Sequence, residues 1–161
     1  VEDGLALFGR GVPSADTVSR LVNLRKTSTV DAESAGQLAL EASAVTPTRV
    51  APRANLRARY SWTLRAAGQA TPCVAETLVS GGGVAVWESR RPMFHGLLVA
   101  EHWPPGMVAD DQTVFVVAET VPPGRYAWVV STWLDRGPGL CRVKPQGAAG
   151  LPVAAVEIRP W

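Results

Sequence analysis

Residues 56–65 have the sequence LRARYSWTLR and alternate strictly between two kinds of side chain. One set is apolar or aromatic and consists of Leu56, Ala58, Tyr60, Trp62 and Leu64. The other set is polar or basic and consists of Arg57, Arg59, Ser61, Thr63 and Arg65. Because successive side chains of a β-strand point to opposite faces of the sheet, this pattern predicts a strand with one buried face. Its other face would present arginines to solvent or to a partner.

The same alternation, or a short apolar run, recurs along most of the chain between turns rich in Gly and Pro. We expect further strands at 36–45, 73–80, 84–89, 94–103, 113–121, 125–134, 140–143 and 151–160. The run of glycines at 81–83 predicts a hairpin, 104–112 is expected to be a loop, and 113–121 a central strand. Since no long helical crossovers separate the strands, the pattern favours a mainly β protein, an antiparallel β-sandwich.

Some spacings are typical of an immunoglobulin-like sandwich. Cys73 and Cys141 lie 68 residues apart, and Trp87 follows Cys73 by fourteen, where it could pack on a disulfide. The pattern then departs from that fold, because Trp128 rather than a cysteine lies two residues after Tyr126. Trp62 also competes for the position of the core tryptophan. The immunoglobulin-like form is therefore one version of the sandwich prediction.

The N-terminal part has a different period. Ser14 is a suitable helix cap, and the residues after it place three apolar side chains at helical spacing: Val18, Leu21 and Val22. We expect a short amphipathic helix over 14–26, within an accessory segment 1–35 that precedes a sandwich domain at 36–161. The apolar stripe must dock either on this domain or on another protein.

The two cysteines favour one disulfide, Cys73–Cys141, over two buried free thiols. A disulfide indicates an oxidising compartment, so we expect an extracytoplasmic protein that is periplasmic, secreted or on a surface. No apolar run is long enough to span a bilayer. A chain that begins at Val1 is expected to be processed or excised, and any membrane attachment would come from an anchor upstream of it.

Every histidine and methionine lies between residues 93 and 107. Met93, His95, His102 and Met107 offer ligands that copper prefers outside the cytoplasm. If 94–103 is one strand, the two histidines are about 23 Å apart on opposite faces, because each residue adds about 3.3 Å. Two half-sites would remain, Met93 with His95 and His102 with Met107, each short of a third ligand. Core packing of the methionines, with the histidines at strand ends, is the favoured interpretation.

Catalytic patterns are absent from the sequence: no GxSxG elbow surrounds a serine, and no phosphate-binding loop follows the glycines. Asp110 and Asp111 are adjacent, and we interpret them as a solvated turn. We therefore expect no enzyme and no cofactor. The net charge of +2 gives no reason to expect nucleic acid as a partner.

Two sets of surface residues are the candidates for binding. Arg57, Arg59 and Arg65 form a basic strip that could hold an acidic partner or sugar acids, or could be a solvated face. Trp103 and Trp133, near strand ends, could stack on sugars or anchor a protein, or could be core residues. The leading hypothesis is a non-enzymatic module or structural subunit of a cell envelope or virion surface that binds another protein of unknown identity. The alternatives are a carbohydrate-binding module and a periplasmic copper-binding protein.

Overall fold

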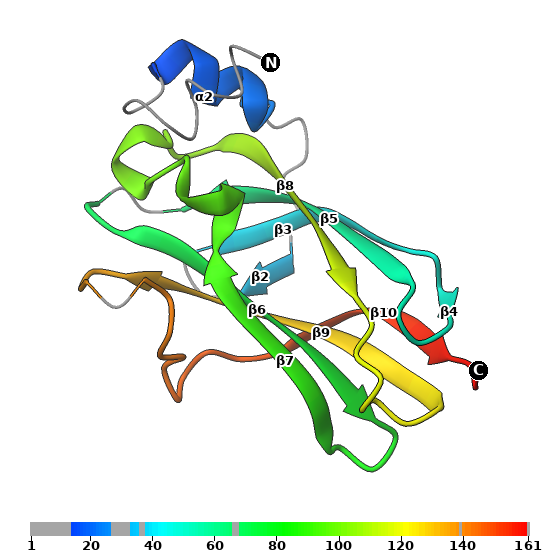
Figure 1. Ribbon diagram of the computed structural model, residues 1–161. Coiled ribbons are helices and arrows are strands. Elements are labelled where there is room, and N and C mark those ends of the chain that lie inside the picture. Colours follow the sequence, from blue (N-terminus) through cyan, green and yellow to red (C-terminus); the bar gives the residue numbers. More distant parts are fainter. Residues whose placement is uncertain (1–13, 27–32, 36–37, 66–67, 139, 161) are drawn as a thin grey trace.

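The computed structural model describes residues 14–26, 33–35, 38–65, 68–138 and 140–160. Within this part, the strands form two five-stranded sheets that pack face to face (Figure 1). The predicted fold class, a mainly β sandwich, is confirmed. The immunoglobulin-like version of it stays a prediction.

The first sheet, sheet A, contains the strictly alternating strand predicted at 56–65. In spatial order its strands are β1 (Arg25–Lys26), β8 (Met107–Val116), β5 (Asn55–Leu64), β3 (Leu38–Thr46) and β2 (Glu33–Ala35). All of these neighbours pair antiparallel. β5 lies in the middle, and its burial alternates along most of its length as the sequence predicted. The apolar set faces the second sheet and the arginines face outward.

The second sheet, sheet B, has β9 and β6 at its centre. In spatial order its strands are β4 (Arg49–Val50), β10 (Leu151–Ile158), β9 (Gly124–Asp135), β6 (Thr71–Ser80) and β7 (Ala85–Pro92). Only the short β4–β10 pair is parallel among these neighbours. The predicted hairpin at 81–83 is confirmed, and Gly83 has a φ of 81° in its turn, a conformation that glycine adopts without strain.

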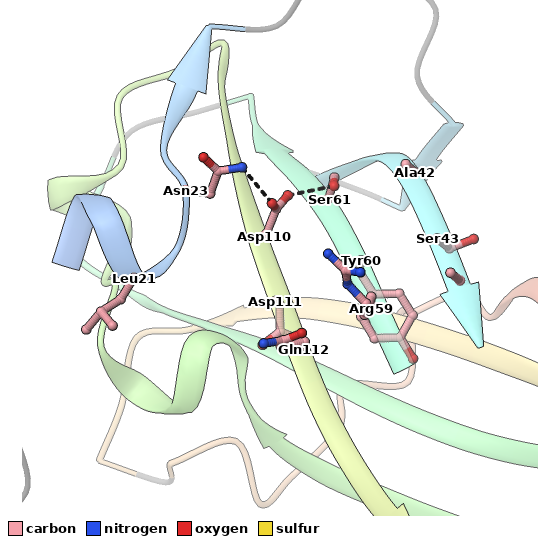
Figure 2. Close-up of a pocket in the computed structure, with 11 residues that line it drawn as sticks. Leu21, Asn23, Ala42, Ser43, Arg59, Tyr60, Ser61, Asp110, Asp111 and Gln112 are labelled. Atoms are coloured by element: carbon pink, nitrogen blue, oxygen red, sulfur yellow. Dashed lines mark hydrogen bonds between the residues drawn. The ribbon is translucent and has the colours of Figure 1, made fainter. Parts of the chain in front are cut away.

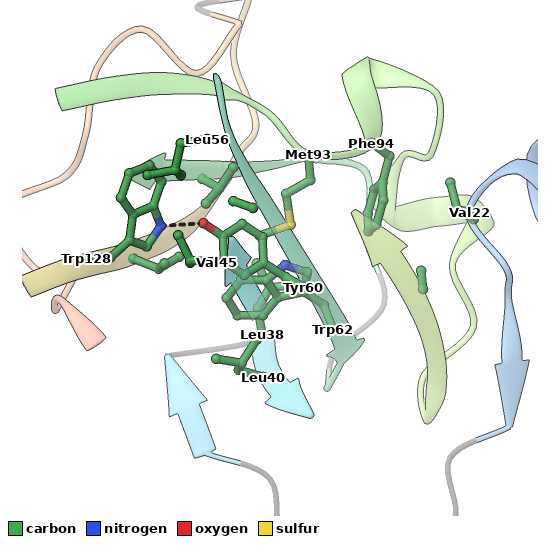
Figure 3. Packing of buried hydrophobic residues seen from close by; sticks show 14 of the residues in the cluster. Val22, Leu38, Leu40, Val45, Leu56, Tyr60, Trp62, Met93, Phe94 and Trp128 are labelled. Carbon is green, nitrogen blue, oxygen red and sulfur yellow. Dashed lines mark hydrogen bonds between the residues drawn. The ribbon is translucent and has the colours of Figure 1, made fainter. Parts of the chain in front are cut away.

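The core lies between the sheets and is rich in aromatic rings (Figure 3). Tyr60 and Trp62 from β5 meet Trp128 from β9, and the Trp128 indole Nε1 donates a hydrogen bond of 2.7 Å to the Tyr60 hydroxyl. Trp62 and Trp128, which the alternation placed in the core, are 0% and 1% exposed. Trp87 packs against Phe115 and Trp128 rather than on the disulfide, so that detail of the prediction is wrong.

The N-terminal helix is shorter than predicted. Helix α2 spans Ala15–Leu21, capped by Ser14, whose hydroxyl accepts a hydrogen bond from the Thr17 amide. Asn23 has a φ of 52°, a left-handed conformation that ends the helix, and β1 begins two residues later. The predicted span of 14–26 is therefore corrected at its C-terminal end.

Helix α2 docks on its own domain. Val18 and Val22 are 8% and 2% exposed and belong to the same apolar cluster as the core of the sandwich. Of the two destinations that the apolar stripe allowed, the described contacts therefore favour the intramolecular one. Leu21 points elsewhere and is 50% exposed. The described part of segment 1–35 thus packs with the sandwich, and the division at residue 35 stays a prediction.

Residues 94–103 do not form the predicted strand. They form two short 3-10 turns, η1 (Met93–Gly96) and η2 (Ala100–His102), and Phe94 and His95 have φ values of 55° and 53°. The apolar side chains of this stretch close one end of the core: Met93, Phe94, Leu98 and Trp103. Packing against an end of the sandwich requires apolar residues but no period of two, which explains the error.

Two further boundaries differ from the prediction. The expected loop 104–112 contains the first half of β8, and the chain leaves the sheet after Val116 rather than at 121. β8 is also not central, because only the two-residue β1 pairs on its outer side, at 107–108. The expected strand 140–143 is absent, since Leu140 and Cys141 both have positive φ in a turn.

Candidate functional site

The predicted arginine strip lies on the outer face of sheet A. Arg57 and Arg59 are exposed on β5, and Arg65 is exposed just beyond the end of that strand. Within the described residues, Arg57 and Arg59 form no ion pair and no hydrogen bond. Elsewhere on the surface, by contrast, Arg49 pairs with Glu157 at 3.0 Å. The strip therefore carries two uncompensated positive charges.

Most side chains beside these two arginines are small or apolar. On β3, the cross-strand neighbours of Arg57 and Arg59 are Thr46 and Ala44. On β8, Arg59 lies opposite Gln112, and Arg57 lies opposite Val114, which is 51% exposed. The next outward residue, Val116, is 62% exposed. The surface thus combines guanidinium groups without described partners with exposed aliphatic groups.

A pocket of about 300 Å³ hollows one end of this surface (Figure 2). Strands β3, β5 and β8 form its floor, and the residues that follow helix α2 form one wall. Its lining includes the polar residues Asn23, Ser43, Arg59, Ser61, Asp110 and Gln112. Among these, sequence reasoning identified only Arg59 as a binding residue. Ser61 lies on the same strand as Arg59, but Asn23, Ser43 and Asp110 come from other segments of the chain, so no local sequence motif predicts the pocket.

Asp110 is the centre of a hydrogen-bonded cluster in this pocket. Its carboxylate accepts bonds from Ser61 Oγ at 2.7 Å, from Asn23 Nδ2 at 3.0 Å and from Arg25 at 3.0 Å. Partial burial favours the neutral carboxyl, but these three donors outweigh burial and hold the pKa of Asp110 below its usual value. The charge of Asp110 is thus already compensated, and Arg59 is left as the unpaired charge of the pocket.

The adjacent Asp111 points to the opposite side of sheet A, into the core. It is 1% exposed, and it accepts two bonds from the Arg91 guanidinium, at 2.8 and 3.1 Å, and one from the Phe94 amide at 2.8 Å. The prediction that Asp110 and Asp111 form a solvated turn is therefore wrong. The two residues lie within β8, whose alternation sends one carboxylate outward and the other inward.

Arg91 also reaches a second buried carboxylate. It donates to Glu76 at 2.9 Å, and Glu76, which is 0% exposed, also accepts a longer bond of 3.3 Å from the Tyr60 hydroxyl. Burial raises the pKa of Glu76 to about 7, although Arg91 opposes this effect. The Arg91 guanidinium thus donates hydrogen bonds to two carboxylates, two bonds to Asp111 and one to Glu76. This network joins sheet A to sheet B, and its burial suits it to a structural role.

The two tryptophans proposed as a sugar-binding surface are not exposed. Trp103 is 1% exposed, stacks edge-on against Phe94 and donates its indole N–H to the Met107 carbonyl oxygen at 2.8 Å. Trp133 is 9% exposed and packs with Cys73 and Cys141. Of the two alternatives for these tryptophans, exposure and core packing, the structure therefore shows core packing.

The methionines and histidines lie in unlike environments. Met93 is 0% exposed in the core, whereas His95 is exposed and its Nε2 donates to the Gln112 carbonyl oxygen at 3.1 Å. His102 is exposed and Met107 is half-buried against the core. The half-site Met93–His95 would need the core residue to turn outward.

In the described part of the chain, one group of three His, Cys, Asp or Glu side chains lies close enough to share an ion, namely Cys73, Asp135 and Cys141. Its two sulfur atoms are joined in a disulfide, which confirms the predicted Cys73–Cys141 bond. Those sulfur atoms are therefore not available as thiolate ligands. The helices and turns described by the structure contain no span suited to crossing a bilayer.

No protein-family model and no curated protein match this sequence. Among solved structures, it is similar to a Niemann-Pick type C2 protein from the Japanese carpenter ant, with 5% identity, a TM-score of 0.49, and coverage of 83% of this chain and 99% of the other. It is also similar to the C-terminal domain of wzt, with 10% identity, a TM-score of 0.49 and coverage of 76% and 74%.

A third similarity is to an alkylpurine DNA glycosylase from Pseudomonas fluorescens bound to DNA with an abasic-site analogue. The identity is 13% and the TM-score 0.48. The match covers 80% of this chain but only 32% of the glycosylase, so this chain spans about a third of that protein. At these levels of similarity, the function must be inferred from the residues themselves.

Proposed function

We propose that this domain binds another protein through the outer face of sheet A. We call this surface the open face, and it consists of Ala42, Ala44, Thr46, Arg57, Arg59, Ser61, Gln112, Val114 and Val116. The observation that carries the proposal is the pair Arg57 and Arg59, unpaired within the described residues, beside the exposed Val114 and Val116. Arginine beside exposed apolar groups is a typical composition of protein interfaces.

The charge of the open face specifies the kind of partner. Two neighbouring guanidinium groups without internal partners favour a segment that carries Asp or Glu. The pocket beside Arg59 adds hydroxyl and amide groups that can bond to a carboxylate or to backbone of the partner. The exposed valines would contribute apolar contact beside these polar anchors.

The proposal is of a non-catalytic binding module in an oxidising compartment outside the cytoplasm. The Cys73–Cys141 disulfide supports the compartment. A serine with an acidic neighbour does occur in the pocket, but the Ser61 hydroxyl donates directly to Asp110, and no described histidine bonds to it. A nucleophilic serine needs a base placed to take its proton.

The test is a selection of peptides from a random display library on the immobilised domain at low salt. We expect the enriched peptides to be rich in Asp and Glu. Their affinity should fall about tenfold or more for the double variant Arg57→Glu/Arg59→Glu, because attraction becomes repulsion. The matched control is Arg142→Glu/Arg159→Glu, which reverses two exposed arginines away from the open face and should bind as the wild type does.

Two results would contradict the proposal. One is an enriched set with no excess of acidic residues. The other is an acidic set that binds the Arg57→Glu/Arg59→Glu variant as tightly as the control, while circular dichroism shows both variants to be folded.

A further inference from the structure

Among the described residues, the outer edge of β8 is covered along only part of its length. The Asp110 amide donates to the Val22 carbonyl oxygen at 2.7 Å, and the Gln112 carbonyl oxygen accepts the bond from His95. These backbone groups therefore point away from β5. Because backbone direction alternates along an antiparallel strand, Val114 and Val116 point the same way. Within the described residues, their N–H and C=O groups have no backbone partner, and their side chains are half exposed or more.

Two nearby sheet edges, the first part of β8 and the edge strand β7, are protected against strand addition. The first part of β8 is covered by residues 22–26, through β1 and Val22. The edge strand β7 of sheet B bears charged residues, and Arg90 donates to the Arg142 carbonyl oxygen at 3.0 Å. Charges and covering loops are the usual protection against strand addition. Residues 113–116, with the sequence TVFV, have neither a charge nor a described cover.

The surroundings of this edge differ on its two sides. On the outer side lies Arg57, opposite Val114 on β5. On the inner side, a small apolar crevice of about 10 Å³ lies between the two sheets, lined among others by Trp87, Phe115, Val116 and Val121. A strand added to β8 would turn alternate side chains toward each of these environments.

We propose that the partner adds an antiparallel or parallel strand to the edge of β8 at Val114 and Val116, with acidic and apolar residues in alternation. The acidic residues face outward on the same side of sheet A as Arg57, which lies on the strand next to β8, about 4.8 Å from it. The apolar residues face inward toward the crevice beside Trp87. This inference rests on the proposed function, because it states how the acidic partner docks on the open face. Main-chain bonds would supply affinity and the alternating side chains specificity.

The test uses the tightest peptide from the display selection and the wild-type domain. Each peptide amide is methylated in turn, which removes one N–H without changing the side chains. In an added strand, alternate amides face β8, so affinity should fall about tenfold at every second position and change about twofold or less between them. A scan without a period of two would overturn strand addition.

Two variants of the domain give an independent readout. In Val114→Pro the lost N–H faces away from β5, so the sheet keeps its bonds while the edge loses a donor. Val114→Thr keeps both the N–H and the β-branched shape and serves as the control. We expect the peptide to lose about tenfold or more in affinity for Val114→Pro and about twofold or less for Val114→Thr. Equal binding by both folded variants would contradict the proposal.

These outcomes separate the two proposals. Binding that depends on Arg57 and Arg59 but shows a flat methylation scan would leave the proposed function in place and remove strand addition. Binding that does not depend on the arginines would remove the proposed function. If sedimentation shows a wild-type dimer and a monomeric Val114→Pro variant, a second copy of this chain occupies the edge instead, and the partner strand is overturned.

Discussion

The outer faces of the two sheets differ in whether another part of the described chain covers them. On sheet B, the outward side chains of the central strands include Cys73, Ala75 and Trp133, and residues 140–150 fold over them. We call this segment the cover loop. The disulfide attaches it to β6, and Ala148 packs on the same cluster. On sheet A, the central strand turns Arg57 and Arg59 outward, and the open face has no equivalent cover among the described residues.

The difference follows from the outward residues themselves. Apolar groups on a second face must be removed from water, so sheet B needs a cover, and the chain supplies it at the cost of a long connection. Arginines with hydrated charges need none. Among the described residues, nothing covers the unpaired charges and exposed valines of the open face. This is why we propose it as the surface that binds another molecule.

Loss of the disulfide should have the largest effect, because it releases the cover loop. With a sequence separation of 68 residues, the double variant Cys73→Ser/Cys141→Ser should lower the free energy of unfolding by about 4 kcal/mol. Urea unfolding followed by tryptophan fluorescence would measure this loss and the exposure of Trp133. Reduction of the wild type should reproduce it. A loss of less than about 1 kcal/mol would mean that the disulfide does not hold the cover.

The free energy of unfolding should depend on pH because Glu76 is buried in the core between the two sheets. Its pKa rises from 4.5 unfolded to about 7 in the fold, so the folded state binds more protons between these values. The free energy of unfolding should therefore fall by about 3 kcal/mol as pH increases from 4.5 to 7. Glu76→Gln should remove this fall. Parallel pH profiles for wild type and variant, measured by chemical unfolding, would contradict the assignment.

A glycine in the cover loop offers a smaller test of how closely it packs. A Cβ at Gly150 would lie 2.6 Å from Val129 Cγ1 on β9, whereas one at Gly147 would have no neighbour within 4 Å. We expect Gly150→Ala to destabilise the domain by about 1–3 kcal/mol through overpacking. Gly147→Ala is the matched control and should change little. Equal melting temperatures for the two variants would show that the cover loop can shift away from Val129 without loss of stability.

The open face should respond least in stability. Arg57→Glu/Arg59→Glu changes exposed side chains that support no described contact, so the free energy of unfolding should shift by less than about 0.5 kcal/mol. Thermal unfolding would measure the shift. A loss of several kcal/mol would mean that these arginines belong to the fold rather than to a binding surface.

The sequence predicted the sandwich well where alternation is strict, as in β5. It failed at β8, because the adjacent Asp110 and Asp111 resemble a solvated turn. The burial of Asp111 depends on Arg91, which lies twenty residues earlier and reaches it from the other sheet. The pairing of the Asp111 charge with Arg91 exists only in the folded chain, so the sequence around Asp111 does not predict it.

The candidate site shows the same limit. The arginine strip could be predicted because Arg57 and Arg59 lie on one regular strand. The pocket beside them could not, since Asn23, Ser61 and Asp110 come together only when residues 22–26 cover the edge of β8. For Trp103 and Trp133, the sequence left exposure and core packing open, and the structure shows core packing. Trp103 closes one end of the core, and Trp133 is covered by a loop that the disulfide attaches.

The most direct test of the account is amide hydrogen exchange of the domain with and without the tightest selected peptide. We predict that exchange in residues 112–116 and 55–61 slows about tenfold or more when the peptide is saturating, while β7 and the cover loop are unchanged. Protection confined to β7 or to the cover loop, with none in residues 112–116, would contradict the central claim that the open face is the binding surface.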